Sequence, residues 1–395
     1  MAIAKKIEGF ITQSSWIRKM FEDGLKLKAQ FGEEKVFDFS LGNPNIHIDT
    51  PERFKATLRE VAAQSPVGVH AYMPNAGFYE TRKAVARHVG GEHGVSLTAE
   101  HIVMACGAGG ALNVAFKTLL DPGDEVVFPS PFFVEYRFYV DNHDGVSRPV
   151  DTAEDFSLDL PAMEAAITEK TKIVMINSPN NPTGTVYDEA SIRGLAAILE
   201  KKSAQFGREI YLVSDEPYRD IVYDGIKVPS VLSAYRNSMI ATSYSKNISI
   251  PGERIGYLAV SPDIAGLKML MEGFGLSTRI LGFVNAPALM QRVVQAIQGE
   301  RVDMGVYRKK RDLFYDGLQS IGYELNKPQG AFYLFPKAPI DDDVAFVKAL
   351  QGKNILTVPG SGFGRAGHFR IAYCVDDRTI INSMSGFREV FEAYR

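Results

Sequence analysis

Residues 238–260 read SMIATSYSKNISIPGERIGYLAV, a polar loop between two apolar runs. The runs SMIATS and IGYLAV are typical of buried strands. Ser243, Ser245, Lys246 and Arg254 fall in or beside the loop. A solvated loop lysine is the ordinary explanation for such a sequence. Two serines and an arginine could instead hold a dianion beside the lysine, which makes this loop a candidate binding site.

Similar apolar runs alternate with helical patterns between about residue 100 and residue 260. The runs are 101–106, 124–129, 172–177, 209–214, 238–243 and 255–260. Continuous apolar strands separated by helices are typical of a mostly parallel sheet that is covered on both faces. The sequence therefore predicts an α/β fold, with a three-layer α/β/α large domain whose ligands bind at the carboxyl ends of the strands.

The two ends of the chain lack this alternation. Their helical patterns and few strand-like runs predict a smaller α+β domain. A chain of 395 residues is long enough for two domains. We expect a large domain over 46–285 and a small domain built from 1–45 and 286–395.

The composition is that of an ordinary globular protein, with 45% hydrophobic and 23% charged residues. A net charge of −3 argues against nucleic acid or an anionic membrane as a partner. No apolar run approaches the roughly 18 residues of a membrane span, and no signal peptide is recognisable. Cys106 and Cys374 are too few for a disulfide framework or a cysteine-built metal site. A cytoplasmic location is expected.

Three further polar clusters follow predicted strands, and each also has a purely structural explanation. The segment CGAGGALN (106–113) could bind a phosphate at a helix amino terminus, or form only a tight turn. The segment NSPNNPTG (177–184) could present an asparagine at a strand end, or simply cap a turn. Asp215 in SDEPYRDIVYD (214–224) is paired or functional if it is buried, and otherwise an exposed loop acid.

Together the clusters fit one cofactor, pyridoxal 5′-phosphate. A lysine in a pocket or beside a cation has a lowered pKa and becomes a nucleophile toward aldehydes. Lys246 could hold the cofactor's aldehyde as a Schiff base, and Asp215 could keep the pyridine nitrogen protonated. The protonated ring would accept the electrons left when the Cα–H bond of a substrate breaks.

The order of seven motifs extends this interpretation to the whole chain. They are YMPNAG (72–77), GAGGAL (107–112), PSPFFVEY (129–136), NNPTG (180–184), DEPY (215–218), SYSKNISIPGERIG (243–256) and FRIAYC (369–374). In this order they resemble the class I/II aminotransferase family of fold-type I pyridoxal-phosphate enzymes, of the aspartate and aromatic type. The resemblance implies the fold, the cofactor and an amino-transfer reaction.

The resemblance also implies roles for individual residues. Lys246 would carry the cofactor and move the substrate's proton, Asp215 would pair with the pyridinium nitrogen, and Tyr218 and Asn181 would hydrogen-bond the phenolic oxygen. The phosphate would be bound by Ser243, Ser245, Arg254 and the backbone N–H groups of Ala108 and Gly109, and by Tyr72 of the neighbouring subunit. The substrate would be bound by Arg370, through its α-carboxylate, and by Gly42 and Asn181.

Some positions depart from the family pattern. The aromatic residue that stacks on the ring is Phe132 or Phe133, and Phe133 is preferred. The segment 107–109 lacks the hydroxyl or lysine of many relatives, which removes one side-chain contact. Arg279 could replace that cation, although a surface or interface arginine is the more ordinary explanation.

The sequence thus predicts a homodimeric aminotransferase with ping-pong kinetics, with 2-oxoglutarate as the expected acceptor and aspartate among the candidate donors. One alternative keeps the cofactor but acts as a Cβ–Sβ lyase. A second is a non-catalytic sensor on the same fold, which the complete set of chemical residues disfavours. The substrate side chain would be selected by the amino-terminal segment around Ser14, Ser15 and Trp16 as it closes over the pocket.

Overall fold

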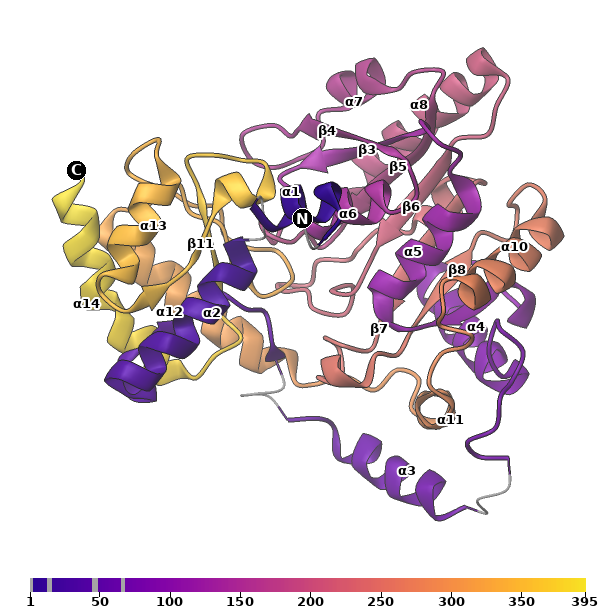
Figure 1. Cartoon of the computed structure of the whole chain (residues 1–395), viewed down its shortest axis with the longest axis horizontal. Helices are drawn as coiled ribbons and strands as arrows, with labels where there is room; N and C mark the ends of the chain where they lie inside the picture. The colour runs from indigo at the N-terminus through magenta and orange to yellow at the C-terminus, as the bar shows by residue number, and fades with distance from the viewer. Residues whose placement is uncertain (1–2, 13–15, 45–48, 65–67) are drawn as a thin grey trace.

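The computed structural model describes residues 3–12, 16–44, 49–64 and 68–395. Two packed units are visible in Figure 1, and the smaller one lies on the left, where α2, α12, α13 and α14 gather. The larger unit, on the right, surrounds the main sheet. No described helix is both long enough and apolar enough to cross a membrane.

A seven-stranded sheet with the order β2-β8-β7-β6-β5-β3-β4 forms the centre of the larger unit. Pairing is parallel from β7 to β4, whereas β8 is antiparallel to both β7 and β2. The strands are β2 (Ile102–Ala105), β3 (Glu125–Ser130), β4 (Val146–Asp151), β5 (Thr171–Asn177), β6 (Tyr211–Asp215), β7 (Ser238–Ser243) and β8 (Gly256–Val260). The predicted α/β class and mostly parallel sheet are confirmed. Edge strand β4 was not predicted, because its sequence VSRPVD lacks a continuous apolar run.

Helices bury both faces of this sheet. In β2, Ile102 and Met104 belong to one hydrophobic core, and Val103 and Ala105 belong to another. Because successive strand residues point to opposite faces, this alternation means that both faces are covered. The helices of the first core are α3 (Glu52–Ala63), α4 (Tyr79–His93), α7 (Leu160–Ala166), α8 (Glu189–Phe206), α9 (Val231–Ala234) and α11 (Ala288–Ala296). Those of the second are α5 (Gly107–Leu119), α6 (Glu135–Asp141) and α10 (Leu267–Ile280).

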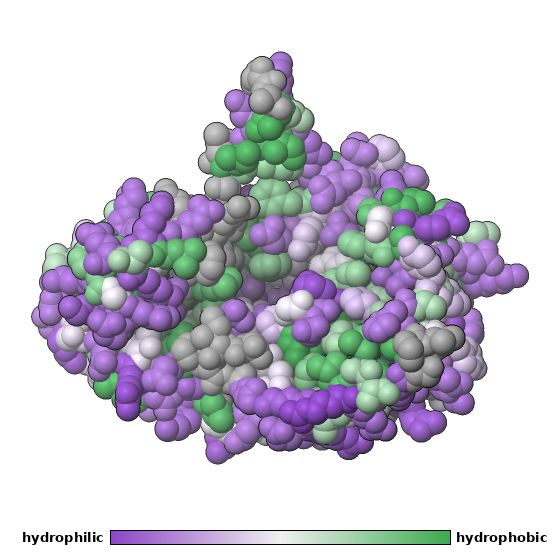
Figure 2. All heavy atoms as spheres, turned by 60° about the horizontal axis from the view of Figure 1, so that its bottom comes forward, coloured by the Kyte–Doolittle hydropathy of each residue, from purple (hydrophilic) through white to green (hydrophobic). Residues whose placement is uncertain are grey.

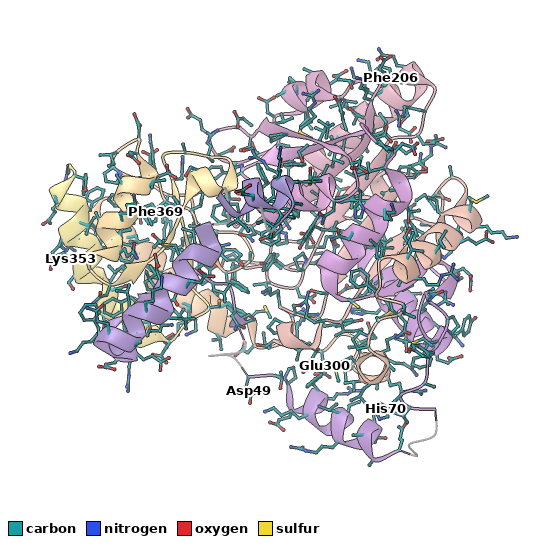
Figure 3. All side chains as sticks on the ribbon, viewed as in Figure 1. Asp49, His70, Phe206, Glu300, Lys353 and Phe369 are labelled. Carbon is teal, nitrogen blue, oxygen red and sulfur yellow. The ribbon has the colours of Figure 1, made fainter. Side chains whose placement is uncertain are left out.

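The smaller unit has its own core, rich in phenylalanine and tyrosine. Its helices are α2 (Trp16–Phe31), α12 (Met304–Ile321), α13 (Asp343–Gln351) and α14 (Asp377–Ala393). Its strands are β1 (Phe37–Asp38) beside β10 (Ile355–Leu356), and β11 (Val358–Pro359), β12 (Phe369–Ala372) and β9 (Tyr333–Leu334) in one antiparallel sheet. In Figure 3 Phe369 lies inside this unit, whereas Lys353 lies at its outer edge.

Two helices pack against the larger unit although the expected domain limits assign them to the small domain. Helix α11 lies beyond the expected limit at residue 285, yet it packs against α3 and α4 of the larger unit. Helix α1 (Lys5–Thr12) falls in the expected small domain, but Phe10 contacts Phe138 of α6 edge to face, at 4.9 Å between ring centroids. We therefore propose that the smaller unit begins near residue 300 in its second segment and excludes α1 from its first.

Candidate active site

A cavity of about 260 Å³ opens where β5, β6 and β7 end, beside the start of α5. Figure 2 shows the surface hollowed between the two units. Of the residues predicted to bind the cofactor, the α-carboxylate or the substrate backbone, all except Tyr72 line the cavity. These residues are Gly42, Ala108, Gly109, Phe133, Asn181, Asp215, Tyr218, Ser243, Ser245, Lys246, Arg254 and Arg370. The structure thus brings together residues that are up to 328 positions apart in the chain, from Gly42 to Arg370.

Asp215 is the last residue of β6, and its carboxylate is buried. Its Oδ2 accepts a hydrogen bond of 2.5 Å from the hydroxyl of Tyr136, and its buried Oδ1 has no partner. Burial raises the pKa of Asp215 to about 7, although the hydrogen bond from Tyr136 opposes this shift. The unpartnered Oδ1 is therefore a strong acceptor for a donor that enters the cavity.

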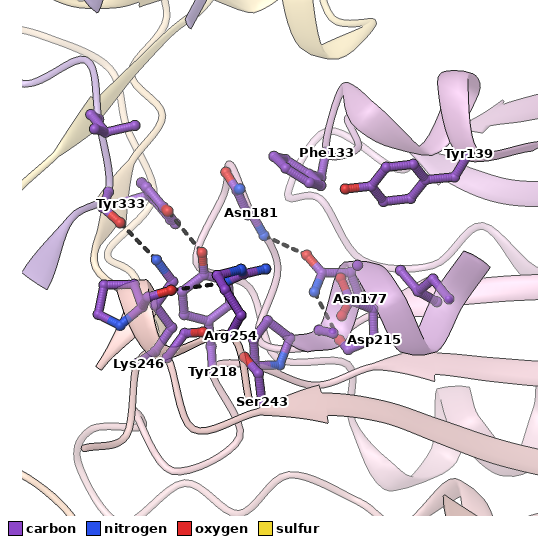
Figure 4. A pocket seen from close by; sticks show the side chains of 18 of the residues that line it. Phe133, Tyr139, Asn177, Asn181, Asp215, Tyr218, Ser243, Lys246, Arg254 and Tyr333 are labelled. Atoms are coloured by element: carbon purple, nitrogen blue, oxygen red, sulfur yellow. Dashed lines mark hydrogen bonds between the residues drawn. The ribbon is translucent and has the colours of Figure 1, made fainter. Parts of the chain in front are cut away.

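Asn177 connects the ends of two neighbouring strands. Its Nδ2 donates to the backbone carbonyl of Asp215 at 2.8 Å, and its Oδ1 accepts from the backbone N–H of Asn181 at 2.7 Å. These bonds appear as a short chain in Figure 4. They fix the loop after β5 against the end of β6, so that Asn181 and Asp215 line the same cavity.

Lys246 follows β7, and its Nζ donates to the backbone carbonyl of Gly42 at 2.7 Å. The pKa of Lys246 is lowered to about 8, mainly by burial and also by the nearby cations Arg254 and Arg370. A fraction of the amine is thus neutral near pH 7, as a nucleophile or base requires. Gly42 has no room for a side chain, because a Cβ there would collide with the hydroxyl of Tyr333.

Helix α5 begins at Gly107 with no side-chain cap, so its first N–H groups remain available to a ligand. Gly107 has a positive φ of 72°, and a Cβ there would lie 2.7 Å from Nη2 of Arg254. Arg254 itself is left-handed, with φ 51°, and its Nη1 donates to the carbonyl of Pro251 at 2.8 Å. A positive side chain at a helix amino terminus is a typical anion site.

Arg370 comes from β12 of the smaller unit and is almost fully buried. Its Nη1 donates to Oδ1 of Asn181 at 3.0 Å, and its Nη2 donates to the carbonyl of Ser40 at 2.5 Å. Its guanidinium lies between the rings of Tyr333 and Phe363, at 4.7 and 4.8 Å from their centroids. The buried Nε has no partner. The cation is rigidly held, and its unused donor requires an acceptor.

Of the two candidate stacking residues, Phe133 lines the cavity. Phe132 is 2% exposed and packs edge to face on Phe128, at 4.8 Å. Figure 4 shows Phe133 and Tyr139 on the same side of the cavity. These two rings give that side an aromatic surface.

Other predicted residues lie elsewhere. Tyr72 is 89% exposed and does not line this chain's cavity. Arg279 is exposed near the end of α10. Ser14 and Ser15 lie outside the described residues, and Trp16 begins α2.

Sequence reasoning missed several residues of the cavity wall. They are Leu41, Leu112, Tyr139, Asn177, Pro217, Pro251 and Tyr333. Asn177 could have been predicted from the sequence, because it is the polar last residue of a predicted strand. Tyr333 could not have been predicted in this way, since it reaches the site from a short strand of the smaller unit. Its hydroxyl lies 2.8 Å from that of Tyr218.

Known proteins share the sequence pattern and the fold of this chain. The family described as "Aminotransferase class I and II" matches residues 34–384. A "Probable aspartate aminotransferase" of Methanocaldococcus jannaschii is 32% identical over 368 residues, which cover 90% of this chain and 93% of that protein. A solved aminotransferase from Eubacterium rectale is 40% identical, with a TM-score of 0.96 over 100% of both chains. The aspartate aminotransferase from Thermus thermophilus with maleate is 28% identical, with a TM-score of 0.88 over 99% of this chain and 100% of that chain.

Proposed function

The chain belongs to the class I and II aminotransferase family and is an amino-acid aminotransferase, and we propose that its cavity binds pyridoxal 5′-phosphate. The unpartnered, buried Oδ1 of Asp215 carries this proposal, because it suits the protonated ring nitrogen of such a cofactor. The start of α5 with Arg254 suits the phosphate, and the amine of Lys246 suits the aldehyde.

When bound, the cofactor supplies an aldehyde that can carry an amino group and a ring that accepts electrons from the substrate Cα. Lys246 would accept the proton from that carbon and return it later, since a pKa of about 8 leaves both protonation states accessible. Tyr218 would donate to the cofactor's phenolic oxygen, because burial raises the pKa of Tyr218 and keeps its hydroxyl protonated. Asn181 would donate to the same oxygen.

Arg370 would bind the α-carboxylate of the amino acid. Its unpartnered Nε and its fixed plane between two aromatic rings support this role. A guanidinium binds a carboxylate through two parallel hydrogen bonds, so the substrate would be oriented as well as attracted. The carbonyl of Gly42 now accepts from Lys246, and substrate would lie near this backbone segment.

Aspartate is the amino donor that we propose, with 2-oxoglutarate as acceptor. The relatives named as aspartate aminotransferases support this choice. Within the described part of this chain, the cations of the cavity wall are Lys246, Arg254 and Arg370, and each already has a role. A second carboxylate would therefore need a cation from another subunit, for which the exposed Arg279 is a candidate.

A homodimer would also complete the phosphate site through Tyr72. The 89% exposure of Tyr72 leaves its ring available to a second chain. Its loop is joined to the segment that follows α10, because Nδ2 of Asn75 donates to the carbonyl of Val284 at 2.6 Å. Leu276 and Ile280 of α10 are exposed apolar residues. Exposed apolar side chains such as these are typical of a subunit interface.

Absorbance spectroscopy of the purified protein tests the proposal. We expect a visible band from bound cofactor, which bleaches when aspartate is added without any oxo acid and returns when 2-oxoglutarate is added. The amino acid that bleaches the band fastest identifies the donor. Release of pyruvate and ammonia with recovery of the band would instead indicate a lyase. A protein that stays colourless with added cofactor would contradict the proposed site.

A further inference from the structure

A buried hydroxyl outside the cavity wall donates to the carboxylate of Asp215. Tyr136, in the first turn of α6, donates to Oδ2 of Asp215 at 2.5 Å, but it does not line the cavity. We infer that Tyr136 is a positioning residue, which favours the ionised form of Asp215 and holds its carboxylate turned so that Oδ1 meets the cofactor's ring nitrogen. This inference rests on the proposed cofactor site.

Packing leaves the Tyr136 ring little freedom. The side chain is almost wholly buried, and its ring contacts Phe128 and Phe133 edge to face, at 6.1 and 5.6 Å between centroids. Both phenylalanines belong to the segment that leads from β3 into α6. The hydroxyl is therefore held in place by the second hydrophobic core, and it can hold the carboxylate in turn.

The two oxygens of Asp215 have different surroundings. Oδ2 accepts a hydrogen bond from Tyr136, whereas the buried Oδ1 has no partner. No lysine or arginine forms an ion pair with Asp215 among the described residues. Its other charged or titratable neighbours are Glu216, Tyr139 and Tyr218, and none of them is a cation. The hydroxyl of Tyr136 is thus the side-chain donor that opposes the cost of burying this carboxylate.

Protonation follows from this arrangement. Burial raises the pKa of Asp215 to about 7, and the hydrogen bond from Tyr136 lowers it. Burial also raises the pKa of Tyr136 well above its ordinary value, so the proton stays on the phenol. Without the hydroxyl, the carboxylate would lose its donor and would be protonated at a higher pH. A neutral carboxyl group would hold a protonated ring nitrogen less tightly than a carboxylate does.

A simple packing role predicts something different. If Tyr136 only fills space in the core, its hydroxyl would not distinguish ligands that carry a ring nitrogen from those that lack it. The distinguishing measurement is therefore the preference of the cofactor-free protein for pyridoxal 5′-phosphate over its 1-deaza analogue, in which a C–H replaces the ring nitrogen. This preference is a ratio of two dissociation constants, so it does not depend on turnover.

The test compares wild type with Tyr136→Phe, by titrating each cofactor-free protein with both ligands near neutral pH. We expect Tyr136→Phe to lower the preference about tenfold, as loss of one hydrogen bond to a charged group implies, and to leave analogue binding within about twofold. Tyr235→Phe is the matched control, because its buried hydroxyl donates to the backbone carbonyl of Ile210 at 2.8 Å, in the other core. It should leave the preference unchanged.

A second experiment tests whether Tyr136 acts through Asp215. In an Asp215→Ala background, Tyr136→Phe should no longer change the preference for pyridoxal 5′-phosphate over the analogue.

If Tyr136→Phe does not fold, Tyr136→His is tested in its place, because histidine keeps a ring N–H donor. A folded Tyr136→His that keeps most of the preference supports the inference, and one that loses it overturns the inference. Equal weakening of both ligands by Tyr136→Phe, or no change, also overturns it. Failure of wild type to bind the cofactor would instead overturn the proposed function.

Discussion

Lys246 shows how one residue acquires chemistry from its surroundings. Its Nζ is held by a backbone carbonyl rather than by a carboxylate. Burial and the nearby cations Arg254 and Arg370 destabilise its charged form, so its pKa falls to about 8. An exposed lysine such as Lys309, which pairs with Asp377 at 2.7 Å, has its pKa shifted upward by that partner. The two lysines should thus differ in reactivity near neutral pH.

Competitive labelling with an amine-reactive reagent measures this difference in the cofactor-free protein. The labelling rate of Lys246 should rise with pH up to about 8 and then level off, because only the neutral amine reacts. The rate of Lys309 should still be rising there. Peptide mass spectrometry would follow both sites in the same sample. Parallel pH profiles for the two lysines would contradict the lowered pKa of Lys246.

At the scale of elements, the site depends on the joined ends of β5 and β6. Asn177 satisfies the backbone carbonyl of Asp215 and the backbone N–H of Asn181, and all three residues are buried. Removal of its side chain would leave both backbone groups without these partners, in a region with little access to water. The cost should therefore appear both in the stability of the fold and in the position of the loop.

Asn177→Ala should lower the free energy of unfolding by about 2 to 6 kcal/mol, since each of the two unsatisfied buried groups costs about 1 to 3 kcal/mol. Urea denaturation of the cofactor-free protein would measure this change. The same variant should weaken substrate binding through Arg370, because Asn181 accepts from that guanidinium at 3.0 Å. An unchanged denaturation midpoint would show that water or rearranged loop atoms replace the lost bonds.

At the scale of the whole molecule, the ionised site opposes folding. A buried carboxylate with a pKa of about 7 binds its proton more tightly in the folded chain than in the unfolded one, where the ordinary value is 3.8. The folded state thus carries more bound protons between about pH 4 and pH 7. Its stability therefore falls as the pH rises through that window, and the loss is complete above about pH 7.

The cofactor-free wild type and Asp215→Asn should accordingly diverge with pH. Relative to the neutral asparagine variant, wild type should lose on the order of 4 kcal/mol of unfolding free energy between about pH 4 and pH 8. Denaturation at several pH values gives the difference, in which the other titrating groups largely cancel. A difference that stays constant, or grows in favour of wild type, would falsify the raised pKa.

The proposed dimer makes a separate prediction for Tyr72. If Tyr72 serves the neighbouring subunit, Tyr72→Ala and Lys246→Ala should each lose most activity as pure proteins. Mixing them in equal amounts with exchange of subunits should restore roughly a quarter of the wild-type sites, because each mixed dimer has one intact site. Assay of the mixture after dissociation and reassociation would reveal this. No recovery would mean that Tyr72 acts within its own chain or not at this site.

The amino-acid sequence by itself determined the α/β class, six of the seven strands of the main sheet and most of the cavity wall. Strands buried on both faces must be continuously apolar, and the polar residues that interrupt this pattern mark the strand ends where ligands bind. Asp215 and Lys246 were found in this way. Edge strand β4 was not predicted, because its partly exposed residues do not form a continuous apolar run.

Only the tertiary structure decided which residues from distant segments reach the site. Tyr136 is 79 positions from Asp215, Tyr333 is 115 from Tyr218, and the two units meet at the bond between Arg370 and Asn181. The sequence around Tyr136 and Tyr333 does not show what their hydroxyls contact, since a buried aromatic ring gives the same apolar pattern whatever its hydroxyl contacts. The partner of such a hydroxyl depends on how separate elements pack, and that information is spread over the whole chain.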